Sequence, residues 1–172
     1  LYTRAFQLLV SIGNMDVMKM MADVTNTIAE GEVLQLTKAG NPDTTEDEYF
    51  QVITSKTAVL FAAATAGGAI LANKDQTTID KCYQYGLNLG IAFQLIDDVL
   101  DYEGNAADMG KNVGDDLAEG KPTLPLIYAM KNGSEQQAQR IRSAIENKTA
   151  SDIENIIAIV QQSGALTYTK AR

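Results

Sequence analysis

A cluster of carboxylates inside an apolar segment is the part of this sequence best suited to chemistry. The run GIAFQLIDDVLDY places Asp97, Asp98 and Asp101 among large apolar side chains. In a helix of about 3.6 residues per turn, Asp97 and Asp101 share one face about 6 Å apart along the axis, and Gln94 lies one turn earlier on that side. Carboxylates at this spacing repel each other and lose hydration against apolar neighbours. The cluster therefore predicts a bound cation.

The oxygen chemistry of the cluster indicates Mg²⁺. Carboxylate oxygens suit this ion, which keeps several waters and is commonly shared with substrate phosphates, so a diphosphate is the natural co-ligand. A calcium loop starting at Asp101 would need glycine at its sixth position and an acid at its twelfth, where the sequence has Ala106 and Asn112. A solvated acidic helix face is the alternative interpretation, and the apolar flanks argue against it.

A glycine-rich, charged segment follows the cluster and supplies two lysines, Lys111 and Lys121. These lysines could simply balance the neighbouring acids, or they could reach a diphosphate while the glycines bring backbone N–H groups close to it. The segment contains no GxxxxGK[ST] pattern, so it is not a Walker loop.

Lys56 and Thr57 form a second candidate, in the run ITSKTAVL. In isolation, a lysine in a helix is most simply a surface residue. The alanine-rich segment on its C-terminal side favours a different interpretation, in which Lys56 crosses to a phosphate inside a helical bundle.

Composition limits the classes of protein that remain. The 172 residues, 45% of them hydrophobic, suit one domain with a sizeable core. The net charge of −8 argues against nucleic-acid binding, and we expect no membrane-spanning run, no signal peptide and a cytoplasmic location. With Cys82 as the single cysteine and no histidine, internal disulfides, the usual zinc sites and His-based nucleophile systems are excluded.

Helix signals without a strand pattern predict an all-α fold for residues 1–172 as a single domain. Gly86 and Gly90 should allow a neighbouring backbone or a ligand to approach closely. Both ends open onto helical patterns, so we expect a fragment of a longer protein. The expected helices cover residues 1–12, 15–37, 45–71 and 77–102, a short helix from Pro122 to Gly133, and two more that begin at the capping pairs Ser134/Gln137 and Ser151/Glu154.

The sequence resembles the trans-prenyl diphosphate synthase family. FQLIDDVLD followed by GKNVGDDLAEGKPTLPL is similar to the family's second aspartate-rich motif and the lysine loop after it. YTRAF, IAEGEVLQL and SKTAVLF also look like this family, so the likeness covers nearly the whole chain. It is greatest to bacterial members that build octaprenyl chains for quinones.

The resemblance implies an isoprenoid-synthase helical bundle, present as roughly its second half, that elongates an allylic diphosphate, such as farnesyl diphosphate, with isopentenyl diphosphate. It also implies a homodimer with a membrane-partitioning product. Carried over by position, the implied metal ligands are Asp97, Asp98 and Asp101, the implied catalytic residues are Asp97, Asp98 and Lys56, and the implied substrate-binding residues are Lys56, Thr57, Gln94, Lys111 and Lys121.

The family's first aspartate-rich motif, its arginine pair and its isopentenyl diphosphate site have no counterpart in this sequence. We therefore expect the chain alone to be inactive. Two alternatives stay open at this point: a terpene cyclase of the same fold, and a regulatory partner of a complete synthase. The lysine loop favours elongation over cyclisation, and the intact acidic motif disfavours a scaffold.

Overall fold

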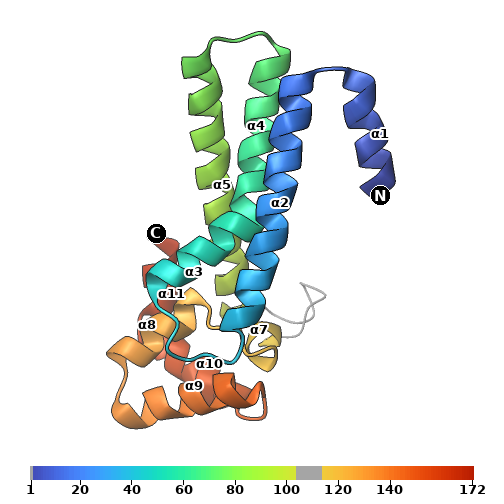
Figure 1. Ribbon diagram of the computed structural model, residues 1–172. Helices are drawn as coiled ribbons and strands as arrows, with labels where there is room; N and C mark the ends of the chain where they lie inside the picture. Colours follow the sequence, from blue (N-terminus) through green and yellow to red (C-terminus); the bar gives the residue numbers. More distant parts are fainter. Residues whose placement is uncertain (1, 104–113) are drawn as a thin grey trace. The chain divides into compact units, whose positions relative to one another are not determined.

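The described residues of the computed structural model, 2–103 and 114–172, form helices joined by short connections and contain no strand (Figure 1). This confirms the all-α prediction. The helices are α1 (Tyr2–Ile12), α2 (Met15–Lys38), α3 (Glu46–Ile53), the π-helical turn η1 (Thr54–Ala58), α4 (Val59–Leu71), α5 (Gln76–Glu103), α7 (Asp115–Ala118), α8 (Leu124–Asn132), α9 (Glu135–Asn147), α10 (Ile153–Gln162) and α11 (Ala165–Lys170).

Contacts between Cα atoms divide the chain into two compact units. Unit 1 comprises Leu1–Glu32 and Ile53–Ile91, and unit 2 comprises Val33–Val52 and Ala92–Arg172. The long helices α2 and α5 contribute residues to both units. The single domain expected over residues 1–172 stays a prediction.

Helix α5 packs backbone to backbone against η1 and α4 within unit 1. A Cβ atom added to Gly90 would lie 2.5 Å from the Cα of Ala58, and one added to Gly86 would lie 2.5 Å from the carbonyl oxygen of Phe61. Ala58 and Ala62 are fully buried at this contact. The glycines of α5 therefore admit a neighbouring backbone, one of the two possibilities that the sequence left open.

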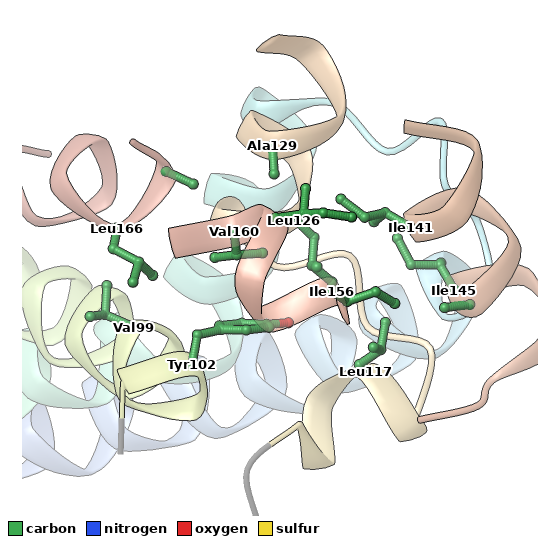
Figure 2. Close-up of a cluster of buried hydrophobic side chains, with 13 residues drawn as sticks. Val99, Tyr102, Leu117, Leu126, Ala129, Ile141, Ile145, Ile156, Val160 and Leu166 are labelled. Carbon is green, nitrogen blue, oxygen red and sulfur yellow. The ribbon is translucent and has the colours of Figure 1, made fainter. Parts of the chain in front are cut away.

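The core of unit 2 joins the end of α5 to the C-terminal helices. Val99 and Tyr102 from α5 point into a cluster with Leu117 of α7 and Ile156 of α10, all of them 1% exposed or less (Figure 2). This core fixes the last turns of α5, which carry the acidic cluster.

Local signals located most helix ends correctly. Thr45 and Glu48 form the expected capping box: the Thr45 N–H donates to Glu48 Oε2 at 2.9 Å and the Glu48 N–H donates to Thr45 Oγ1 at 3.2 Å. Ser134 and Gln137 form the second box.

Two helix-end predictions were wrong. Helix α10 begins at Ile153 after Asp152, without a side-chain cap, so Ser151 and Glu154 do not form a box. Helix α8 begins at Leu124, so Pro122 lies before the helix and not in its first turn. The proline in the first turn is Pro125.

One continuous helical stretch among the described residues, Glu46–Leu71, has the length and composition that a membrane-spanning helix needs, with a mean hydropathy of 1.3. This differs from the expectation that the chain has no run long and apolar enough to span a membrane. Core helices of water-soluble proteins meet the same criterion, and the alanine-rich half of this stretch packs its small side chains inside unit 1, where Ala62, Ala63 and Ala66 are at most 1% exposed.

Candidate metal and diphosphate site

The acidic cluster lies in unit 2, on the last turns of α5. Asp98 is 2% exposed and Asp101 is 8% exposed, whereas Asp97 is half-buried. The apolar flanks are less buried than the sequence suggested, since Phe93 is 55% exposed. Burial of charge is therefore greatest at Asp98 and Asp101.

Both oxygens of Asp98 accept hydrogen bonds from protein side chains. The Tyr49 hydroxyl of α3 donates to Oδ2 at 2.7 Å, and Gln94 Nε2 donates to Oδ1 at 2.8 Å. Burial raises the pKa of Asp98 to about 7, with Asp116 and Asp97 adding repulsion and the two hydrogen bonds opposing the rise. Burial and the neighbouring Asp98 raise the pKa of Tyr49 well above its usual value, so Tyr49 remains a donor.

One oxygen of Asp101 lacks a hydrogen-bond donor among the described residues. Its Oδ2 atom is buried and accepts no hydrogen bond within the described part of the chain. Burial and repulsion from Asp116 raise the pKa of Asp101 to about 6, although backbone N–H groups of Asp116 and Gly114 partly offset this rise. An unpaired buried carboxylate oxygen is costly unless a cation or a proton binds it.

Lys121 supplies positive charge in unit 2 but is already paired with acids. Its Nζ atom lies 2.9 Å from Asp116 Oδ1 and 2.6 Å from Glu119 Oε2. Burial lowers the pKa of Lys121, but the bonds to Glu119 and Asp116 outweigh that effect and hold it above its usual value. Lys121 is thus a charged, half-buried donor. Lys111 lies outside the described residues.

The donor set fits Mg²⁺. No group of three or more acidic, cysteine or histidine side chains in the described ranges is arranged to hold a metal. Mg²⁺ is usually bound through one or two carboxylates, with waters and substrate phosphates completing its shell, so a full protein cage is not required. Asp101 provides an uncompensated buried oxygen, and Asp97 provides a half-buried carboxylate one turn away on the same helix face.

Lys56 and Thr57 lie in unit 1, in the π-helical turn η1 between α3 and α4. Single π turns within α-helices occur frequently at functional sites. The backbone of α2 approaches this turn so closely that a Cβ atom on Gly31 would lie 2.7 Å from the backbone nitrogen of Lys56. The Lys56 ammonium lies 3.0 Å from Glu32 Oε2, with the lysine side chain 31% exposed.

The structure brings together some of the expected residues and adds others. Gln94 and Asp98 are bonded directly, and Lys121 joins Asp116. Sequence reasoning missed Tyr49, because nothing in its neighbourhood marks a tyrosine as the partner of a carboxylate 49 residues later. It also missed the pairing of Glu32 with Lys56, for which the interior glycine Gly31 was the available signal.

Comparisons with known proteins agree in pointing to one family. A family model described as polyprenyl synthetase matches residues 1–162. The octaprenyl diphosphate synthase of Escherichia coli (strain K12) is 49% identical over the whole chain, which covers 54% of that protein. The all-trans-nonaprenyl-diphosphate synthase (geranyl-diphosphate specific) of Rhodobacter capsulatus is 51% identical, again over the whole chain and 53% of the relative.

A solved structure shows the same fold. The polyprenyl synthase of Caulobacter crescentus CB15, crystallised with calcium and isoprenyl diphosphate, matches with a TM-score of 0.93 and 41% identity. The match covers 98% of this chain and 52% of that one. The chain therefore spans about half the length of the relatives that it matches.

Proposed function

Because the chain belongs to the polyprenyl synthetase family, we propose that it forms part of a Mg²⁺-dependent prenyltransferase that joins isopentenyl diphosphate to an allylic diphosphate such as farnesyl diphosphate. The observation that carries this proposal is the buried acidic cluster of α5, with an Asp101 oxygen that accepts no hydrogen bond in the described ranges. A cation shared with a diphosphate would offset the cost of burying that oxygen.

The chemistry requires a stabilised leaving group. The allylic C–O bond breaks with its electron pair leaving on the diphosphate, and the double bond of isopentenyl diphosphate attacks the resulting cation. Loss of a proton, which the diphosphate can accept, then restores a double bond. Bound Mg²⁺ would supply charge stabilisation for the leaving diphosphate.

This chain's own residues divide those tasks by their chemistry. Asp97, Asp98 and Asp101 form the acidic cluster at which the metal would bind, and the ammonium group of Lys121 would bind diphosphate oxygens. Lys121 must exchange at least part of its contact with Glu119 or Asp116 to do so. The diphosphate-binding role of Lys56, in unit 1, stays a prediction. The substrate-binding roles of Gln94, Thr57 and Lys111 stay predictions from the sequence.

The likeness to an octaprenyl diphosphate synthase supports a long all-trans product, which we propose to be octaprenyl for a quinone side chain, made in the cytoplasm. We also propose a homodimer. Large apolar side chains exposed on α1 support a protein partner over that face, and include Phe6 at 57% and Val10 at 55% exposure.

A chimera tests the activity. The chain replaces its aligned segment in the Escherichia coli relative, and the chimera is supplied with farnesyl diphosphate, labelled isopentenyl diphosphate and Mg²⁺. We expect extension to an octaprenyl product, and a loss of at least about 100-fold in kcat on Asp97→Asn, because a metal ligand is removed. Asp80→Asn, on the exposed first turns of the same helix, is the control and should retain activity.

We expect the 172-residue chain alone to form no product. A chimera that folds but elongates nothing would refute the proposal.

A further inference from the structure

Asp98 differs from Asp101 in how its oxygens are used. Tyr49 and Gln94 each donate to a different oxygen of Asp98, at 2.7 and 2.8 Å, and the side chain is 2% exposed. Mg²⁺ is usually bound through one or two carboxylates, and Asp101 Oδ2, unlike either Asp98 oxygen, accepts no hydrogen bond within the described residues. Asp98 is poorly suited to direct contact with such an ion.

Tyr49 is held so that its hydroxyl can reach only a limited region. The residue is 5% exposed and lies in the first turn of α3, directly after the Thr45/Glu48 capping box. A phenol that donates to a carboxylate forms a charge-assisted hydrogen bond, which is stronger than a neutral one. The bond therefore fixes the Asp98 side chain from a separate helix.

Fixing Asp98 also fixes its neighbours on α5. Gln94, one turn earlier, donates to the same carboxylate, while Asp97 directly precedes Asp98 and Asp101 follows it by three residues. Removing the Tyr49 hydroxyl would leave Oδ2 of Asp98 buried without that donor. The carboxyl group would then rotate or take up a proton, and the helix turn that carries Asp97 and Asp101 would lose one of its anchors, the core contacts of Val99 and Tyr102 remaining.

We propose that Tyr49 is a positioning residue for the metal site: through Asp98 it holds the turn that presents Asp97 and Asp101, while Asp98 itself does not bind the metal directly. This inference rests on the proposed function and divides the roles within its acidic cluster. Partners that orient metal ligands typically contribute 10–100-fold to metal affinity.

Calorimetry with inorganic pyrophosphate and Mg²⁺ on the 172-residue chain tests the proposal without an activity assay. We expect Tyr49→Phe and Asp98→Asn each to weaken Mg²⁺-dependent pyrophosphate binding by about 10-fold, and Asp97→Asn and Asp101→Asn to weaken it by more than about 100-fold. Tyr102→Phe is the matched control: it removes the hydroxyl of another buried tyrosine, one that bonds no carboxylate within the described residues, and should leave binding unchanged.

The outcomes separate the two proposals. If the unmodified chain binds no pyrophosphate with Mg²⁺, the proposed function fails. If it binds, but Tyr49→Phe binds equally well, the positioning role of Tyr49 is refuted. If Asp98→Asn abolishes binding as completely as Asp97→Asn, Asp98 is a metal ligand and the inference is overturned. Helical circular dichroism identifies any variant that fails to fold. If Tyr49→Phe does not fold, the binding measured for Asp98→Asn decides whether Asp98 positions the metal site or binds the metal.

Discussion

Burial of Asp98 should make the metal-free chain less stable as the pH rises. The pKa of this carboxyl group is about 7 in the folded chain, against an ordinary value of 3.8. Between those values the folded state keeps a proton that the unfolded state has lost, so the stability that Asp98 contributes is fully present below about pH 4 and is lost as the pH rises through about 7. At about 1.4 kcal/mol for each tenfold difference in proton affinity, the loss is about 4 kcal/mol.

Two neighbouring groups define where this effect can be measured. Asp101, with a pKa of about 6, acts in the same direction within the same window. Glu48 acts in the opposite direction, because the bond from Lys38 and the backbone N–H of Thr45 lower its pKa to about 2. Its stabilising contribution is present above its ordinary pKa of 4.5 and is lost only as the pH falls towards about 2. The range from about pH 4.5 to 8 therefore isolates the buried aspartates.

Urea unfolding in the presence of a chelator, followed by helical circular dichroism, measures the free energy of unfolding across that range. Carbon-13 NMR of the Asp98 carboxyl group reads its pKa directly. Asp98→Asn should remove the part of the pH dependence that Asp98 contributes and leave the smaller part that Asp101 contributes, because asparagine carries no titrating charge. If the unmodified chain and Asp98→Asn lose the same stability between about pH 4.5 and 8, burial of Asp98 is not the cause and the reasoning is refuted.

Three further substitutions, one of them a control, test other parts of the structure. Glu119→Gln should tighten Mg²⁺-dependent pyrophosphate binding about 3-fold in calorimetry, because the carboxylate of Glu119 competes with the ligand for Lys121 and an exposed ion pair of this kind is worth up to about 1 kcal/mol. Unchanged or weaker binding would contradict this competition. Gly90→Ala should lower the free energy of unfolding by about 1–3 kcal/mol, because its Cβ atom would lie 2.5 Å from the Cα of Ala58, whereas Gly68→Ala meets nothing within 4 Å and should stabilise the chain by up to about 1 kcal/mol. Equal effects of the two substitutions in urea unfolding would show that close packing at Gly90 is not the determinant.

Signals that act over one helical turn were the ones that sequence analysis could interpret. The Thr45/Glu48 box depends on residues three positions apart, and the glycines of α5 indicated a close approach through their lack of a side chain. The Ser151 prediction failed because a matching pair of residue types does not determine where the first helical hydrogen bonds form. There the chain starts α10 one residue later than a box with Ser151 as N-cap would place it, at Ile153.

Contacts between distant parts of the chain were the ones that sequence analysis could not supply. The bond between Tyr49 and Asp98 depends on the phase at which two separate helices meet, which neither helix encodes alone. The π turn at Lys56 was likewise not predicted from the sequence. The acidic motif identified the chemistry, but the unequal burial of its three aspartates became visible only in the folded chain.

The capping box of α3 and the acidic cluster of α5 form one chain of cause and effect. Glu48 has a pKa of about 2, so it stays ionised and holds the start of α3 throughout the range in which Asp98 titrates. Tyr49, the next residue, keeps its proton over the same range because burial and Asp98 raise its pKa. The donor that fixes Asp98 is thus insensitive to pH while its acceptor is not. A change in metal binding between about pH 5 and 8 should consequently report on the aspartates of α5 rather than on loss of the helix that positions them.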